Sequence, residues 1–347
     1  MPFSVRKFSE CQLSDPLFDS LKKDYDGFED WFKKKSESGE DAYVYDENGI
    51  QAFLYIKDLD SEEVGDLPAE PRMKIGTLKI GSAVEGRRLG EGAIGIALWR
   101  WQRSELDQIY ITVYPHHDDL IVLLRTYGFE KCGKKGGEDV FVRDKRNMRY
   151  DTVRTSFPYL NPNFSRGKYI PIEEAYHDSM FQYSDLMNTL QDIGEMYVSN
   201  GITKNFIATP AGLIDYLPGD VAFIYRKSGT DPKTYKSVVT SYCTVSNVTW
   251  VKQGGRQLID VRSYMKLVGN KSVYGQEVLA ETHKRANVCI IELVYNGYFG
   301  AGHNITHNYL ETSGLFEKHP YMTELSRADV LRIMKKGGKD EHDIIIN

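Results

Sequence analysis

The sequence predicts an α+β protein of two domains. Its 347 residues exceed one typical domain, and a chain of this length usually divides into two. Helical and strand periodicities are mixed in residues 1–145, whereas residues 167–347 are richer in strands. The segments before residue 85 have the pattern of an antiparallel meander, so we expect a mixed sheet and not a doubly wound parallel one.

Capping residues, periodicity and turn residues predict the elements of the first domain. Ser14-Asp15 precedes apolar residues at helical spacing, and Phe28 to Phe32 continue a second helix. Asp46-Glu47-Asn48-Gly49 is a strong hairpin turn between strands at 42–45 and 50–56. Further strands are expected at 72–82, 108–113, 129–132 and 140–143, and further helices at 93–104 and 120–127. The expected order is ααβββαβαββ.

The segment Arg87-Arg88-Leu89-Gly90-Glu91-Gly92 lies between an expected strand and an expected helix. The start of a helix gathers free backbone N–H groups, and the helix dipole adds partial positive charge there. Glycine lets a ligand approach the backbone closely. The segment therefore predicts a phosphate or pyrophosphate site. Its expected residues are Val84, Arg87, Arg88, Leu89, Gly90, Glu91, Gly92 and Ala93.

Two other phosphate-binding motifs fit this segment less well. A Walker loop needs a lysine and a hydroxyl residue after its last glycine, and neither follows Gly92. Gly90, Gly92 and Gly95 spell Gly-x-Gly-x-x-Gly, but a dinucleotide site opens a βαβ unit, which the preceding strands do not form. An ordinary strand-to-helix turn, with glycines for packing, is the structural alternative.

The spelling Arg-x-x-Gly-x-Gly resembles the acyl-CoA pyrophosphate loop of the GNAT family of N-acetyltransferases. The expected element order over residues 1–145 is similar to that fold, and Tyr127-Gly128-Phe129 resembles the family's turn before its final strands. The resemblance implies acetyl-CoA as co-substrate and acetyl transfer to an amine. It also implies that a backbone N–H of a splayed strand polarises the thioester carbonyl.

Acetyl transfer needs a base for the ammonium proton and an acid for the departing thiolate. The family commonly places the acid, a tyrosine, five residues before the phenylalanine of the Gly-Phe turn. Leu124 occupies that position here and cannot donate a proton. Replacement candidates are the acids Tyr127 and Tyr114 and the bases Glu85, His116 and His117. A solvated carboxylate and loop histidines beside a helix start are the alternative, and proximity with a water chain would require none of these groups.

Composition is that of an ordinary soluble protein, with 41% hydrophobic and 27% charged residues. No apolar run approaches the ~18 residues of a membrane span, and the N-terminus lacks a signal-peptide core. The 4 cysteines are scattered, which suggests neither disulfides nor zinc. His303 and His307 lie four apart without the glutamate of a paired metal motif. We expect a cytoplasmic protein without a metal.

A linker is expected at residues 146–166, where a charged segment is followed by Pro158 and Pro162. Strands are expected beyond it at 168–172, 205–208, 221–226, 237–251 and 288–294, and helices at 183–200, 272–285, 305–312 and 328–336. A small β-barrel with helices fits this order. The domains are therefore expected at 1–145 and 167–347.

Leu217-Pro218-Gly219-Asp220-Val221 leads into a strand that ends in Tyr225-Arg226. This phrase, together with 168–172 and Tyr176-His177, resembles the PUA-like superfamily, particularly its ASCH and EVE-type members. The resemblance implies recognition of RNA or modified nucleobases in a cleft on the barrel. A simple turn between strands is the alternative.

Charge is unevenly distributed along the chain. Residues 226–285 hold 11 basic and 4 acidic residues with interleaved tyrosines and a tryptophan, although the net charge of the chain is −5. Cations attract phosphates and aromatic rings stack on bases, which makes this segment a candidate nucleic-acid surface. Its candidate contacts are Arg226, Lys227, Lys236 and Lys252. The alternative is that strand aromatics are core and exposed lysines are ordinary.

These features predict an acetyl-CoA-dependent N-acetyltransferase whose second domain recognises the acceptor, with RNA or aminoacyl-tRNA as candidates. Two alternatives stay open. The first is a CoA-binding nucleic-acid sensor without catalysis, which the leucine at position 124 favours. The second is an acetyltransferase that acts on a protein or a small amine.

Overall fold

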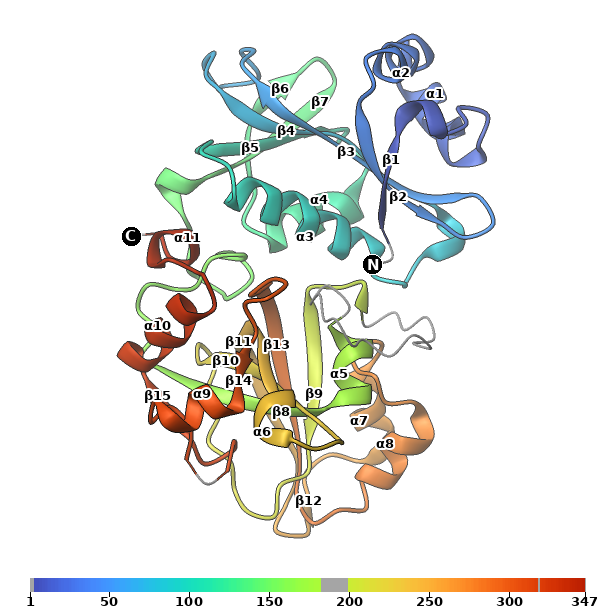
Figure 1. Cartoon of the computed structure of the whole chain (residues 1–347). Coiled ribbons are helices and arrows are strands. Elements are labelled where there is room, and N and C mark those ends of the chain that lie inside the picture. The colour runs from blue at the N-terminus through green and yellow to red at the C-terminus, as the bar shows by residue number, and fades with distance from the viewer. Residues whose placement is uncertain (1–2, 182–198, 318, 347) are drawn as a thin grey trace. The chain divides into compact units, whose positions relative to one another are not determined.

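The computed structural model describes residues 3–181, 199–317 and 319–346 (Figure 1). The chain forms two compact units, Met1–Met148 and Arg149–Asn347, which are described separately below. Residues 149–166, where the sequence suggested a linker, fall within the second unit, and Leu160 and Phe164 are part of its core. The helix expected at 183–200 lies almost wholly outside the described residues.

The first unit contains a seven-stranded mixed sheet in the order β1-β2-β3-β4-β5-β7-β6. The strands are β1 (Ser4–Lys7), β2 (Asp41–Asp46), β3 (Ile50–Asp60), β4 (Arg72–Ile80), β5 (Gln108–Val113), β6 (Glu130–Lys135) and β7 (Glu138–Asp144). β4 and β5 are parallel, and the other neighbouring strands are antiparallel. The mixed sheet predicted from the sequence is therefore confirmed.

Helices pack on both faces of this sheet. They are η1 (Phe8–Glu10), η2 (Pro16–Phe18), α1 (Asp19–Asp24), α2 (Phe28–Glu37), η3 (Ser82–Val84), α3 (Leu89–Gln102), α4 (Asp118–Thr126) and η4 (Lys145–Asn147). Phe53 and Tyr55 of β3 pack with aromatic residues of η1 and α2. Because side chains alternate along a strand, Ala52 and Leu54 face the opposite side, where α3 covers β3, β4 and β5 (Figure 1).

Strand β1 was not predicted from the sequence. It is a four-residue edge strand, Ser4–Lys7, whose side chains are exposed or half-buried. It pairs with β2 through the register Ser4 to Val44. An edge strand with little burial lacks the alternating apolar pattern on which strand prediction depends.

The second unit contains an eight-stranded mixed sheet with the path β15-β8-β10-β11-β13-β9, while β12 and β14 both pair with β11. The strands are β8 (Arg166–Glu173), β9 (Thr203–Ala208), β10 (Val221–Lys227), β11 (Val238–Gln253), β12 (Arg256–Gln257), β13 (Val288–Tyr298), β14 (Ile305–Thr306) and β15 (Glu324–Ser326). The path ends at β15 and at β9, and no pairing between them closes it in the described part of the chain. The predicted α+β class is thus confirmed, although the described strands of this unit do not form the small closed barrel that the sequence suggested.

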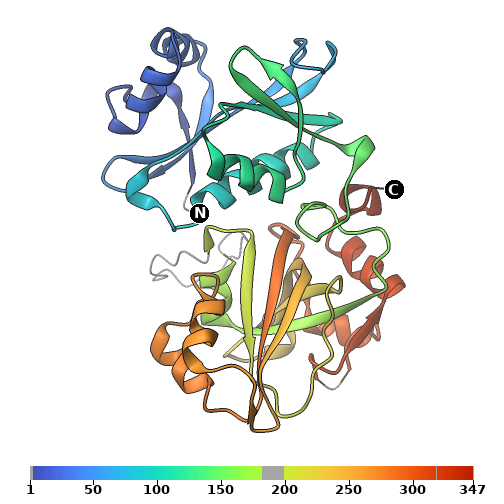
Figure 2. The ribbon, with the colours of Figure 1, turned by 180° about the vertical axis from the view of Figure 1, so that it is seen from behind.

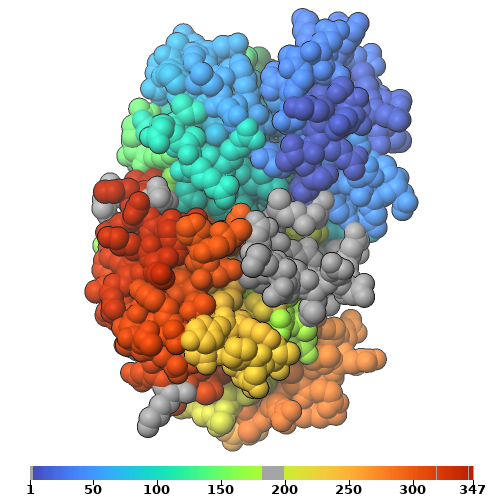
Figure 3. Space-filling model, viewed as in Figure 1, coloured from blue at the N-terminus to red at the C-terminus, as the bar shows by residue number. Residues whose placement is uncertain are grey.

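Seven described helices accompany this sheet: α5 (Glu174–Met180), α6 (Lys233–Lys236), α7 (Val261–Val268), α8 (Gln276–Thr282), α9 (His307–Thr312), α10 (Arg327–Lys336) and α11 (Glu341–Ile344). The helix expected at 272–285 is the shorter α8, and α7 was not predicted. Figure 2 shows the long strands β11 and β13 side by side. α6 and α9 lie against each other on the surface in Figure 3.

Clusters of buried side chains stabilise the second unit, and two of them lie within its described residues. One joins β8, β10 and α10 through Tyr169, Phe223 and Val330. The other joins β11 and α7 through Val251 and Tyr264. In the residues that the model describes, no helix combines the length and the apolar character required to cross a membrane.

Candidate functional site

The parallel strands β4 and β5 pair over only part of their length. Their register joins Met73–Ile75 to Ile109–Ile111 and continues no further within the described strands. β4 nevertheless pairs with β3 as far as Ile80, and β5 pairs with β7 as far as Val113. The ends of β4 and β5 therefore separate from each other while each remains in the sheet. The edges of the two strands that face each other, at residues 77–80 of β4 and 112–113 of β5, therefore carry N–H and C=O groups that take no part in β4–β5 pairing.

A β-bulge at Gly76 coincides with the point where the two strands separate. β3 pairs Tyr55 with Thr77 and Ile56 with Ile75, so Gly76 is the extra residue of β4. A bulge bends its strand and increases its twist, which moves β4 away from β5. Glycine is required here because a Cβ atom would lie 2.6 Å from Cδ1 of Tyr55.

Past its open end, β4 leads through η3 into residues 87–92, the glycine loop, where α3 begins. The Arg88 backbone adopts the left-handed conformation, with φ of 64°, directly before the helix. The first helical hydrogen bond runs from the Gly92 amide to the Arg88 carbonyl oxygen at 3.1 Å. The amides of Leu89, Gly90 and Glu91 precede that bond, which places them at the positive end of the helix dipole.

Side-chain interactions hold the loop in this shape. Arg88 donates to Oε2 of Glu91 at 3.1 Å and 2.6 Å, and Tyr127 donates to Oε1 of the same carboxylate at 2.7 Å. Arg87 forms an ion pair with Glu47, in the hairpin turn between β2 and β3. The side chains of Val84, Leu89 and Ala93 are buried, so these residues can offer a ligand only their backbone.

This arrangement suits a ligand with a phosphate or diphosphate joined to an extended amide-bearing arm. The diphosphate fits the helix start, because the amides and the dipole there favour negative charge. The extended arm fits the open strand edge. The amides of the arm can form with β4 the hydrogen bonds that a neighbouring strand would otherwise make.

The catalytic candidates lie in different surroundings. Leu124 is fully buried, as expected of an apolar helix face. Tyr127 is 2% exposed, and its hydroxyl is directed to Glu91 of α3. Glu85 and His116 are exposed, Glu85 just after η3 and His116 in the turn after β5. The model brings Tyr127 to the glycine loop and His116 to the end of β5.

A polar cluster at the end of β5 contains residues that sequence reasoning missed. Tyr114 donates a 3.3 Å hydrogen bond to the Asp24 carbonyl oxygen, and its ring lies against that of Tyr25. Tyr25 donates to Glu138 of β7 at 3.0 Å. Burial, followed by the Glu138 carboxylate, raises the pKa of Tyr25. These contacts join the end of α1 to β5 and β7. The sequence does not predict them, because the residues involved are far apart in the chain.

In the second unit, Arg226 is part of a buried ionic cluster. It is 5% exposed and donates to Asp178 at 2.8 Å and 2.9 Å and to Glu174 at 2.6 Å. Burial opposes ionisation of the Asp178 carboxyl. The hydrogen bonds from His177 and Arg226 outweigh that penalty and lower its pKa to about 2. The guanidinium of Arg226 thus forms ion pairs with two carboxylates of α5.

His177 completes this cluster. Its Nδ1 lies 2.8 Å from Asp178 and its Nε2 lies 2.8 Å from the Thr240 hydroxyl. A carboxylate only accepts hydrogen bonds, so Nδ1 is the donor and the neutral ring accepts at Nε2 from Thr240. Burial is the main cause that lowers the pKa of His177. The imidazole is therefore held in one neutral tautomer.

The other predicted nucleic-acid contacts are closer to solvent. Lys227 pairs with Glu173, Lys236 donates to the Thr230 hydroxyl at 3.0 Å, and Lys252 is half-buried on β11. The aromatic residues Tyr225, Tyr242 and Tyr264 belong to the core, which leaves them unable to stack on bases, whereas Tyr235 is 60% exposed.

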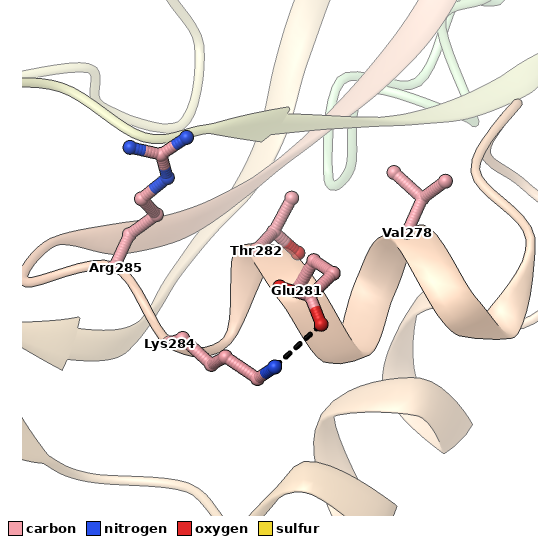
Figure 4. Close-up of a pocket in the computed structure, with 5 residues that line it drawn as sticks. All are labelled: Val278, Glu281, Thr282, Lys284 and Arg285. Atoms are coloured by element: carbon pink, nitrogen blue, oxygen red, sulfur yellow. Dashed lines mark hydrogen bonds and ion pairs between the residues drawn. The ribbon is translucent and has the colours of Figure 1, made fainter.

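A basic surface forms where β12 meets the turn after α8. The Gly255 amide donates to the Ala286 carbonyl oxygen at 2.9 Å, which brings the β11–β12 hairpin beside that turn. Arg256, Lys284 and Arg285 are exposed there. Val278, Glu281, Thr282, Lys284 and Arg285 line a pocket there, and Figure 4 shows their side chains with the ion pair between Lys284 and Glu281.

This chain resembles several solved structures, although its sequence matches no protein in the comparisons with family models and curated proteins. No protein-family model matches the chain, and no curated protein matches its sequence. The solved structures that it resembles include the putative acetyltransferase yncA of Salmonella typhimurium with acetyl-CoA, at 14% identity and a TM-score of 0.31, over 42% of this chain and 94% of that one.

Two more of these structures are an N-acetyltransferase and an ASCH protein. The PaiA N-acetyltransferase of Thermoplasma acidophilum with coenzyme A matches at 12% identity and a TM-score of 0.31, over 42% of this chain and 99% of that one. The ASCH protein of Zymomonas mobilis matches at 10% identity and a TM-score of 0.33, over 49% and 94%. The resemblance to GNAT N-acetyltransferases and to an ASCH protein, expected from the sequence, is thus confirmed as a likeness of structure. What this chain binds does not follow from it.

Proposed function

We propose that the first unit binds acetyl-CoA and transfers its acetyl group to an amine. The observation that carries this proposal is the separation of β4 from β5 beyond Ile75, next to the glycine loop and the start of α3. The open edge accommodates the pantetheine arm, and the amides of 89–91 accommodate the diphosphate.

The reaction needs little from side chains once both substrates are positioned. The amine nitrogen attacks the thioester carbonyl carbon and loses a proton to the base, the C–S bond breaks, and the coenzyme A thiolate takes up a proton. A β4 amide near the bulge donates to the carbonyl oxygen as negative charge develops there. Positioning alone contributes several kcal/mol to such a transfer, roughly 7–11 in well-oriented systems.

Proton transfer is assigned to residues near the two ends of this site. Glu85 and His116 are the candidate bases, because both are exposed beside the elements that would carry the substrate. Tyr114 follows the open end of β5 and is the candidate acid. Tyr127 is the other acid that the sequence suggested, but its hydroxyl already donates to Glu91, so we assign it a structural role at the glycine loop.

We assign acceptor selection to the second unit, with an RNA-linked amine, such as an aminoacyl-tRNA, as the acceptor. The exposed residues Arg256, Lys284 and Arg285 supply the positive surface that a phosphate backbone requires. Lys227, Lys236 and Lys252 extend the positive charge of this unit. Arg226 contributes to the fold of this unit through its bonds to Asp178 and Glu174.

The test has two stages. Calorimetry with coenzyme A and acetyl-CoA asks whether the first unit binds the cofactor, and absence of heat with both overturns the proposal. Labelled acetyl-CoA is then incubated with the protein and total cellular RNA, and separately with a protein extract. Label on RNA supports the assigned acceptor, and label on protein alone overturns it. Coenzyme A binding without label in either arm overturns the RNA-linked acceptor and favours a CoA-binding nucleic-acid sensor.

A further inference from the structure

Three potential metal ligands meet at the end of β5. The ligand atoms of Asp24, His116 and His117 all lie within 4.8 Å of one another. Asp24 is the last residue of α1, and the two histidines form the turn between β5 and α4. In the part of the chain that the structure describes, this is the one group of three or more histidine, cysteine or carboxylate side chains with such spacing.

The fold holds these three groups together without an ion. The His117 amide donates to the Tyr114 carbonyl oxygen at 3.1 Å, which closes the turn that presents both imidazoles. The Tyr114 ring stacks on His116 with centroids 5.6 Å apart and an interplanar angle of 17°. The Tyr114 hydroxyl donates to the Asp24 carbonyl oxygen, which fixes the end of α1 beside the turn. One tyrosine therefore positions residues from both segments.

The donor set matches a borderline transition metal. Zinc binds imidazole nitrogen and carboxylate oxygen at about 2.0–2.2 Å, so tetrahedral ligand atoms lie roughly 3.3–3.5 Å apart. The side chains of Asp24 and His117 are half-buried and that of His116 is exposed, so they can rotate. Such rotation can bring their ligand atoms, which lie within 4.8 Å of one another, to the distances that zinc requires.

We propose that Asp24, His116 and His117 bind a divalent transition-metal ion of the Zn²⁺ class, with a coordination position open to solvent. Three protein ligands with an open fourth position are the arrangement of reactive zinc sites, in contrast to closed structural sites. The ligands come from α1 and the β5–α4 turn and not from the glycine loop, so ion binding can be tested separately from coenzyme binding. His116 is also a candidate base for acetyl transfer, and a bound ion would leave that role to Glu85. The sequence predicted no metal, because Asp24 is far from the histidines along the chain.

The test is calorimetric titration of the full-length, tag-free protein with Zn²⁺, with Co²⁺ absorption as a second readout of the ligand field. We expect one ion per chain. Asp24→Asn, His116→Ala and His117→Ala should each weaken Zn²⁺ binding at least about 100-fold, beyond the 10–100-fold loss typical of outer partners. Asp26→Asn, an exposed carboxylate two residues from Asp24, is the matched control and should bind Zn²⁺ as the unmodified chain does.

Two results would overturn the proposal: no stoichiometric Zn²⁺ binding, or binding that all three variants retain. Circular dichroism of each variant ensures that a loss of binding is not a loss of fold. Asp24→Asn is the most informative variant in this respect, because the backbone carbonyl that accepts from Tyr114 is unchanged. Gly90→Asp, which tests the proposed coenzyme site, should leave Zn²⁺ binding intact and so separates the two proposals.

Discussion

The hydroxyl of Tyr127, at the end of α4, donates a 2.7 Å hydrogen bond to Oε1 of Glu91 in the first turn of α3. Oε2 of that carboxylate accepts from Arg88, whose left-handed backbone starts the helix. Glu91 therefore links the loop before α3 to the helix that follows β5. A tyrosine that the sequence suggests as a catalytic acid thus has a structural task at the glycine loop.

Tyr127→Phe should reduce stability and weaken acetyl-CoA binding without removing the catalytic proton. The lost hydrogen bond to a charged group is worth about 1.5–3 kcal/mol in the free energy of unfolding. Urea denaturation measures that loss, and steady-state kinetics should show a higher KM for acetyl-CoA with an unchanged pH profile of kcat. A kcat about 100-fold lower, with loss of the alkaline limb of the profile, would instead make Tyr127 the acid.

Gly90→Asp should abolish tight coenzyme A binding while the protein stays folded. A Cβ at Gly90 would meet Leu123 at 3.4 Å, an ordinary contact, and an acidic residue in the first turn of a helix favours the helix dipole. The new carboxylate would repel a diphosphate, which we expect to weaken binding on the order of 100-fold, about 2.7 kcal/mol. Calorimetry with coenzyme A measures the effect.

Gly90→Ala is the matched control for this variant, because it adds a Cβ without charge. It should raise helix stability by up to about 1 kcal/mol and leave most of the coenzyme A affinity. Equal binding by the aspartate variant and the alanine variant would show that the diphosphate does not lie at the start of α3.

Gly76→Ala should disturb the point where β4 separates from β5. The added Cβ would lie 2.6 Å from Cδ1 of Tyr55, whose ring is held by Phe8 and Trp31. Overpacking of this kind costs about 1–3 kcal/mol, and thermal unfolding should register it. In a Tyr55→Leu background the cost should shrink, since the clashing ring is absent. An equal cost in both backgrounds would mean that the bulge, and not the ring, requires glycine.

The sequence predicted the elements whose signals are local. Asp15 does cap the first helical turn, since its side chain accepts from the Leu17 amide at 2.9 Å, and the Asn48-Gly49 turn joins β2 to β3 as expected. Helix α10 begins after Ser326, which accepts from the Asp329 amide at 3.2 Å. Caps and tight turns are readable because the residues that bond are neighbours in the chain.

Features that depend on distant contacts were missed. Gly76 carries no sign of a bulge until its partner strand is known, and Asp24 becomes a possible ligand only when α1 packs beside the β5–α4 turn. Arg226 illustrates the same limit in the second unit. A basic residue in a basic segment suggests a surface contact, whereas tertiary packing buries it against Asp178 of α5.

Arg226→Ala should therefore act on stability before it acts on nucleic acid. Removing the guanidinium leaves the buried Asp178 carboxylate without its cationic partner, a change that costs about 3–5 kcal/mol. Arg285→Ala, at an exposed position, should change stability by less than about 0.5 kcal/mol. If RNA binds the surface that contains Arg256, Lys284 and Arg285, the Arg285→Ala variant lowers the slope of log affinity against log salt concentration by about 1.

Filter binding to total RNA at several salt concentrations measures that slope. Lys33→Ala, an exposed lysine of α2 in the first unit, is the control for nonspecific charge. A similar reduction by both variants would place the RNA-binding charge outside the proposed surface. A stable Arg226→Ala protein with weakened RNA binding would restore the direct role that the sequence suggested.

Acidification should destabilise the second unit through His177. Its pKa is lowered in the folded state, mainly by burial, so the unfolded chain takes up a proton at a higher pH than the folded one. Stability therefore falls as the pH decreases below the unfolded value of about 6.5, by at most about 1.4 kcal/mol per pH unit for one proton. His177→Gln removes the titrating group, so the free energy of unfolding should depend less on pH between 7 and 5. Urea denaturation of both proteins across that range measures the difference, and parallel pH curves would show that His177 is not the group responsible.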